Sequence, residues 1–103
     1  MSETLGPALV QKQANIYFDG KCVSHAVLLP DGSRKTVGVI FPAQLTFNTG
    51  VAERMELVTG ACKVRLPGQA WVAFQGGQYF DVPANSQFDI EVSETLHYVC
   101  HFL

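Results

Sequence analysis

Apolar and polar residues alternate in short runs along most of the chain, and glycine, proline, asparagine or aspartate interrupts these runs at short intervals. Alternation with a period of two places successive side chains on opposite faces of a strand, so each run predicts a half-buried strand. No segment after residue 14 has a convincing helical period. About ten strands are expected, over residues 15–18, 21–29, 36–41, 44–49, 53–58, 61–66, 71–74, 79–82, 88–92 and 96–102.

Turn signals separate these strands and predict an all-β sandwich or closed barrel. Residues 30–33 (PDGS) predict a hairpin turn, and the pairs Thr59-Gly60 and Ser93-Glu94 predict two more turns. Residues 1–14 have no clear period, so they are expected to form a tail or an arm packed on a sheet edge. The domain is then expected to cover residues 15–103.

Composition restricts the function classes further. The chain has 103 residues, of which 48% are hydrophobic, which predicts one domain with an adequate core. A net charge of −2 argues against a nucleic-acid partner. Charged residues make up only 16%, which suggests that part of the surface is buried in an oligomer. No apolar run approaches the roughly 20 residues of a membrane span, and the start does not resemble a signal peptide, so a cytoplasmic protein is expected.

The three cysteines predict neither a disulfide framework nor a zinc site. Their number is odd, they lie far apart in the sequence, and no two of them form a CxxC pair; they are Cys22, Cys62 and Cys100. Each lies in an apolar or strand-like run. We therefore expect small buried side chains, and nothing beside them in the sequence would activate a catalytic thiolate.

The first half of the chain resembles the first cupin motif, G-x5-H-x-H-x3,4-E-x6-G. Five residues separate Gly38 from Gln44, and six residues separate Glu53 from Gly60. Gln44 and Thr46 occupy the positions of the two metal-binding histidines. The segment before Glu53 is also longer than the motif allows.

The second half resembles the start of the second cupin motif, because five residues separate Gly77 from Pro83. Phe88 replaces the third histidine of the motif, and Asn85 replaces its second glycine. One carboxylate with an amide, a hydroxyl and a phenyl ring is a poor ligand set for iron, manganese or zinc. The resemblance implies a single-domain cupin, a double-stranded β-helix or jelly-roll barrel, with no metal.

The domain as a whole resembles the pyrimidine/purine nucleoside phosphorylase family of small bacterial cupins. The resemblance covers about residues 15–103, and the order and spacing of its short runs make it specific. It implies a metal-independent homodimer without a cofactor, which cleaves purine and pyrimidine nucleosides with inorganic phosphate to a free base and α-D-ribose 1-phosphate. The runs that carry it are residues 17–21 (YFDGK), 38–39 (GV), 46–47 (TF), 55–60 (MELVTG), 80–83 (FDVP), Phe88 and 98–103 (YVCHFL).

Phosphorolysis needs a carboxylate near the ribose, an aromatic wall for the base and a cation for phosphate. If the motif register holds, Gln44, Thr46, Glu53 and Phe88 point into the barrel. Glu53 is then the expected catalytic carboxylate, and Gln44 and Thr46 are expected to contact substrate. Phe88 and Tyr98 are expected to stack on the base.

The phosphate-binding residue stays open at the level of the sequence. The first candidates are Arg54 or Arg65 near the barrel mouth, or His101, with contact across a dimer interface as an alternative. Simple alternation turns Arg54 away from the face of Glu53. Two other functions also stay open. One is a non-catalytic cupin that binds or senses a small molecule, and the other is a metal-dependent cupin, which the replaced histidines disfavour.

Overall fold

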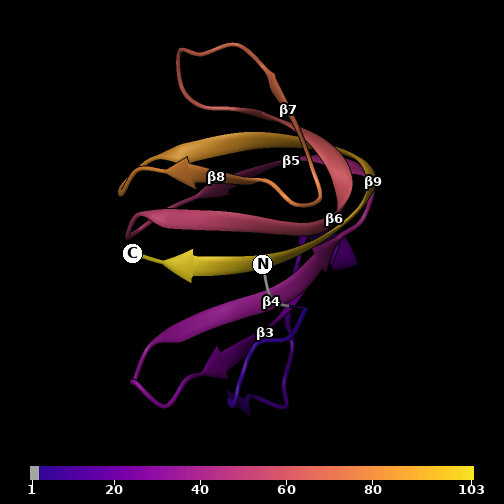
Figure 1. Cartoon of the computed structure of the whole chain (residues 1–103). Helices are drawn as coiled ribbons and strands as arrows, with labels where there is room; N and C mark the ends of the chain where they lie inside the picture. Colours follow the sequence, from indigo (N-terminus) through magenta and orange to yellow (C-terminus); the bar gives the residue numbers. More distant parts are fainter. Residues whose placement is uncertain (1–2) are drawn as a thin grey trace.

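The computed structural model describes residues 3–103, and in this part of the chain it contains nine β-strands and one short 3-10 turn (Figure 1). The expectation of an all-β domain is therefore confirmed. None of the described residues belongs to a helix long and apolar enough to cross a membrane. The elements are β1 (Leu9–Val10), β2 (Asn15–Tyr17), η1 (Phe18–Gly20), β3 (Cys22–Leu28), β4 (Arg34–Ile40), β5 (Ala43–Asn48), β6 (Glu53–Arg65), β7 (Val72–Gln75), β8 (Tyr79–Val82) and β9 (Gln87–Phe102).

Two long strands replace four of the predicted short ones. β6 has 13 residues and β9 has 16, so the turns predicted at Thr59-Gly60 and Ser93-Glu94 are wrong. Both strands curve round one side of the molecule (Figure 1). β6 bends where its register with β9 shifts, between Leu57 and Cys62. A glycine in an apolar run is typical of an irregularity inside a continuous strand as well as of a turn between two strands.

The bends divide one continuous sheet into two facing layers. The first half of β6 pairs with β8 and with the last part of β9, which also pairs with β4. The second half of β6 pairs with β7 and with the first part of β9, which also pairs with β5. The main strand order is β1-β3-β4-β9-β6-β7, and this order does not close on itself. The expectation of a closed barrel is therefore wrong for the described strands, which form an open, strongly bent sheet.

The core lies between the two layers. Its largest fully buried side chains are Phe88, Ile40, Leu57, Ile90, Leu96 and Val82. They come from both layers, and alternation along each strand turns the intervening residues outward. Burial of each such side chain stabilises the fold by about 1.5–3 kcal/mol, so the two layers hold each other in place.

The segment before the domain lies along an edge of the sheet. In β1, Leu9 is the register partner of Leu28 in β3, and Val10 is the partner of Val27. This pairing is what an edge-packing arm would make. Residues 1 and 2 of the expected arm lie outside the described residues.

Gly60 is expected to be the least replaceable residue of the bend. Its φ of +105° is unfavourable for other residues, and an added Cβ would collide with the carbonyl oxygen of Thr95 and lie 2.9 Å from the Cα of Leu96. We expect Gly60→Ala to lower the free energy of unfolding by about 2–3 kcal/mol. Urea denaturation measures this change.

Gly32→Ala is the matched control. Gly32 also has a positive φ, of +87°, but no atom beyond its own chain neighbours lies within 4 Å of an added Cβ. Its replacement should therefore cost only the conformational penalty, about 1 kcal/mol. Equal losses in the two variants would show that close approach of β6 to β9 is not what requires glycine at position 60.

Candidate functional site

A cavity of about 450 Å³ lies between the two layers. Its deeper wall consists of buried residues from β3, β4, β6 and β9, and its rim includes the exposed Phe18 of η1 and Arg34, the first residue of β4. It is lined by Tyr17, Phe18, Cys22, Ser24, Arg34, Thr36, Ile40, Thr46, Phe47, Asn48, Glu53, Met55, Phe88, Tyr98, Cys100 and Phe102.

Glu53 faces this cavity, as its position in the sequence predicts. It opens β6 and shares the inner face of that strand with Met55, which is buried. The thiol of Cys100 donates a hydrogen bond to Glu53 Oε1 at 3.4 Å. Burial raises the pKa of the Glu53 carboxyl above its ordinary value of 4.5, and the Cys100 hydrogen bond only partly opposes this shift. Glu53 is therefore a half-buried carboxylate without a cationic partner among the described ion pairs.

Arg34 is the one cationic side chain that lines the cavity within residues 3–103. Its guanidinium carbon lies 5.1 Å from the centre of the Phe102 ring, a cation–π contact. It makes no ion pair with any described carboxylate. A guanidinium held by a ring and left without an anion can take phosphate through two parallel hydrogen bonds.

The sequence contains a signal for Arg34 that the motif-based reasoning missed. The predicted strand began at Thr36, whereas β4 begins two residues earlier, at Arg34. Thr36 and Ile40 are buried, so alternation places Arg34 on the same inner face. Extending the alternation backward to the hairpin turn would have found it.

The thiols of the cavity are unsuited to nucleophilic attack. Cys22 and Cys100 line it, and all three cysteines are buried and free, as the sequence predicts. Burial raises the pKa of Cys62 to about 11 and, together with the Glu53 charge, that of Cys100 to about 12. Burial also raises the pKa of Cys22. At neutral pH these groups are thiols, and the thiolate is the nucleophilic form.

Phe88 and Tyr98 both contact the cavity but are deeply enclosed. Phe88 is 2% exposed and stacks on Phe47, with ring centres 5.3 Å apart. Tyr98 is 6% exposed, and its hydroxyl lies 3.5 Å from the Cys22 sulfur. Burial raises the pKa of Tyr98, so it is neutral at physiological pH. Their inward orientation agrees with the sequence analysis, although little of either ring is free to stack on a ligand.

The inward orientation predicted for Gln44 and Thr46 is wrong. β5 turns Leu45 and Phe47 toward the core, while Gln44 and Thr46 are exposed. Thr46 reaches the cavity rim, but its hydroxyl donates to Asp89 at 2.7 Å. The motif register put the polar residues inside, whereas burial of apolar area favours the opposite register.

The three cationic residues that the sequence analysis considers for binding phosphate do not line the 450 Å³ cavity. Arg54 pairs with Asp81 at 2.8 Å and stacks on Tyr79, 4.2 Å from the ring centre. Arg65 pairs with Asp89 at 2.9 Å and stacks on Trp71, 4.6 Å from the ring centre. Each arginine therefore already has an anionic partner, and alternation points both outward.

His101 belongs to a polar chain on the outer face of the sheet. Its Nε2 lies 2.8 Å from Glu56 Oε1, and its Nδ1 lies 2.8 Å from the ammonium of Lys35. An ammonium can only donate, so Nδ1 accepts and Nε2 donates to the carboxylate. Arg54, Arg65 and His101 therefore do not line the cavity, and a role of any of them in binding phosphate stays a prediction.

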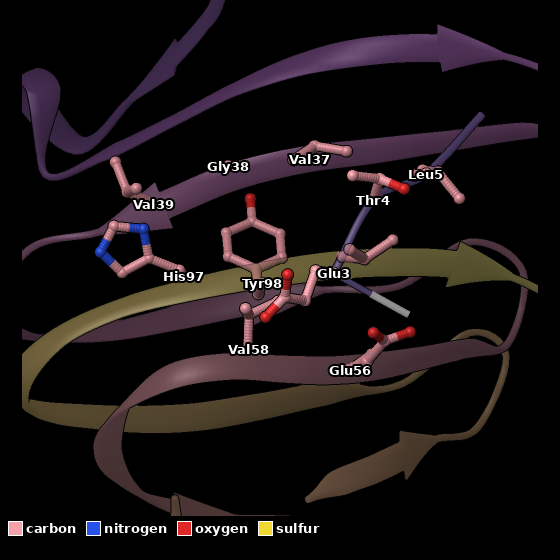
Figure 2. A pocket seen from close by; sticks show the side chains of 11 residues that line it. Glu3, Thr4, Leu5, Val37, Gly38, Val39, Glu56, Val58, His97 and Tyr98 are labelled. Carbon is pink, nitrogen blue, oxygen red and sulfur yellow. The ribbon is translucent and has the colours of Figure 1, made fainter. Parts of the chain in front are cut away.

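A larger hollow, of about 560 Å³, lies on the opposite side of the sheet (Figure 2). Residues 3–5 lie across it, over valines of β4 and β6 such as Val37 and Val58. Its charged side chains are Glu3 and Glu56, which would repel phosphate. The smaller cavity, with its free arginine, is therefore the better candidate site for an anionic substrate.

The described residues contain no group of three or more His, Cys, Asp or Glu side chains spaced to hold a metal ion. The cavity offers one carboxylate, two protonated thiols and hydroxyl groups. Such a set binds transition metals weakly, because imidazole and thiolate are their preferred ligands.

Comparison with known proteins identifies the family. The profile of the pyrimidine/purine nucleoside phosphorylase family matches residues 12–102. A pyrimidine/purine nucleoside phosphorylase of Cupriavidus taiwanensis is 69% identical over 94 residues, which cover 90% of each chain. A protein of the same name from Janthinobacterium sp. (strain Marseille) is 61% identical over the full length of both chains.

Solved structures share the fold of this chain. A protein of unknown function from Acinetobacter sp. ADP1 superposes with a TM-score of 0.96 and 46% identity, covering 99% of this chain and all of that one. The EutQ protein of Clostridium difficile has a TM-score of 0.66 at 10% identity, covering 79% of this chain and 67% of its own. This second likeness shows the fold alone, which is cupin-like. From residue 12 to residue 102, the chain belongs to the pyrimidine/purine nucleoside phosphorylase family.

Proposed function

We propose that this protein cleaves purine and pyrimidine nucleosides with inorganic phosphate, giving a free base and α-D-ribose 1-phosphate without a metal or cofactor. The observation that carries the proposal is the unpaired Arg34 in the same cavity as the half-buried Glu53. Family membership supplies the reaction class, and these two charges supply what that reaction needs. The enzyme is then a glycosyltransferase that moves a pentosyl group to phosphate.

In the proposed reaction, Arg34 holds hydrogen phosphate beside C1′ of the ribose. A phosphate oxygen forms the new bond to C1′ while the C1′–N bond breaks and its electron pair goes to the base. The leaving base gains one proton, and hydrogen phosphate loses one, so the overall reaction balances. A β-nucleoside gives an α product only if phosphate attacks from the face opposite the base.

Glu53 is proposed to stabilise the positive charge that develops on the ribose. The transition state of such a cleavage resembles an oxocarbenium ion. An ionised carboxylate in a half-buried site interacts strongly with that charge because little water screens it. Ser24 and Thr36, which are buried in the same wall, are near enough to the cavity to hold ribose hydroxyls.

We also propose a homodimer that works in the cytoplasm, with the strands arranged as a cupin jelly roll. Exposed apolar residues on the outer face, including Val37 at 38% and Val58 at 49%, support burial in a dimer. Three free cysteines fit a reducing compartment. Size-exclusion chromatography with light scattering gives the mass directly, and a monomer at micromolar concentration would count against the dimer.

A direct assay tests the reaction. Purified protein treated with EDTA is incubated with inosine or uridine, with and without phosphate. We expect free base and ribose 1-phosphate only when phosphate is present, at the same rate before and after chelation. Release without phosphate would indicate hydrolysis, and loss of activity that a divalent metal restores would contradict the metal-free mechanism. Binding without any release would favour a non-catalytic binding protein.

A further inference from the structure

The turn at the rim of the cavity has an unusual backbone. Phe18 and Asp19 both have a φ of +53°, in the left-handed region. Aspartate tolerates this conformation, but for a bulky aromatic residue it is a clear outlier. The amide of Lys21 donates to the Phe18 carbonyl at 3.1 Å, and the amide of Phe41 donates to the Lys21 carbonyl at 2.8 Å. The fold thus holds Phe18 in a conformation that glycine, asparagine or aspartate would occupy more easily.

The ring of Phe18 presents aromatic surface that the deeper rings cannot. It lines the cavity and is 43% exposed, whereas Phe88 and Tyr98 are 2% and 6% exposed. It meets Phe47 edge to face, with ring centres 5.1 Å apart and an interplanar angle of 77°. An aromatic ring in a cavity wall that is packed on one side and open on the other is suited to stacking against a flat ligand.

Phe18 and Arg34 line the cavity from opposite ends of strand β4. Arg34 is the first residue of β4, and the bond between Phe41 and Lys21 ties η1 to the far end of the same strand. Phosphorolysis with inversion requires phosphate and base on opposite sides of the ribose. A cation near one end of β4 and an open ring near the other end are the arrangement that this requirement favours.

We propose that Phe18 is the residue that binds the nucleobase, with the base stacked on its ring. This inference rests on the proposed phosphorolysis at the same site. Stacking recognises the face of a base and not the hydrogen-bonding edge, so purines and pyrimidines both fit. A turn that strains Phe18 places its ring over the site, which accounts for an aromatic residue at a position that favours asparagine or glycine.

The test compares Phe18→Asn with Phe18→Tyr. Asparagine accepts the left-handed backbone and removes the ring, while tyrosine keeps the ring. We expect Phe18→Asn to raise KM for both uridine and inosine by about 10-fold, in the range measured for loss of base stacking. The kcat and the KM for phosphate should change little, and Phe18→Tyr should keep KM close to that of the unchanged protein. Thermal unfolding of Phe18→Asn should occur at the same temperature or higher.

Calorimetric titration of each protein with uridine in the absence of phosphate separates this inference from the proposed reaction. Weaker nucleoside binding by Phe18→Asn supports the role of Phe18 even if no phosphorolysis is found. Unchanged binding and KM in Phe18→Asn would overturn it. An equal rise in KM for phosphate and nucleoside, or failure of Phe18→Tyr to keep binding, would also overturn it, because both indicate a structural role.

Discussion

Replacing Arg34 with alanine is expected to lower kcat/KM for phosphate by roughly 10²- to 10³-fold, since paired charge-assisted hydrogen bonds to a phosphate would be lost. Arg34 is the only cation in the cavity wall formed by the described residues, so no neighbour can replace it. Arg34→Lys should retain part of the activity because the charge remains but the two-pronged geometry does not. Steady-state kinetics at varied phosphate concentration measures both effects.

Arg65→Ala is the matched control for Arg34. Arg65 also stacks on an aromatic ring, Trp71, but it lies outside the cavity and pairs with Asp89. Its replacement should leave the kinetics for phosphate unchanged, since a surface ion pair contributes little to the fold. If Arg65→Ala reduces phosphate affinity as much as Arg34→Ala does, the assignment of Arg34 is wrong.

Replacing Glu53 with glutamine is expected to lower kcat by roughly 10²- to 10³-fold, as expected for removal of one electrostatic group aimed at the transition state. The same variant should be more stable than the unchanged protein at pH 8. Burial raises the pKa of the Glu53 carboxyl above 4.5 in the folded protein, so ionisation is easier in the unfolded chain. Glutamine avoids that penalty.

The sign of the pH dependence follows from the raised pKa. Below pH 4.5 the carboxyl is protonated in both the folded and the unfolded state, and it imposes no penalty for ionisation. As the pH rises through the folded-state pKa, the unchanged protein loses stability relative to Glu53→Gln. Thermal unfolding at pH 4 and pH 8 should therefore show a gain for the variant only at the higher pH.

Glu56→Gln serves as the control because Glu56 lies on the same strand but on the outer face, bonded to His101. It should leave kcat unchanged. A full-rate Glu53→Gln enzyme, or one that gains stability equally at both pH values, would remove Glu53 from the proposed site.

Alternation along the strands predicted much of this molecule. It turned Arg54 away from the face of Glu53, and in the structure Arg54 pairs with Asp81 and does not line the cavity. The predicted inward direction of Glu53, which came from the motif register together with this alternation, also agrees with the structure. These results depend only on the two-residue period and on which face buries apolar area.

The errors have physical causes that the sequence could not reveal by pattern alone. Gly60 reads as a turn, yet it permits a close crossing of two continuous strands, which depends on residue 95 far along the chain. The direction of Gln44 and Thr46 was predicted wrongly because it was taken from the motif. Leu45 and Phe47, the apolar residues that alternate with them, pack on the core instead. Phe18 could not be predicted as an exposed ring, because its left-handed backbone depends on hydrogen bonds to a neighbouring strand.

The sharing of β6 and β9 by both layers has a consequence for how the chain reaches this structure. Neither layer can be completed until these two strands have met, and the segment from residue 66 to residue 86 must be looped out when they do. Closing such a loop costs entropy before any contact compensates for it. A chain dominated by contacts this distant in sequence is expected to fold in milliseconds to seconds. Its two halves form a single cooperative unit, so neither half would persist if the chain were cut between them.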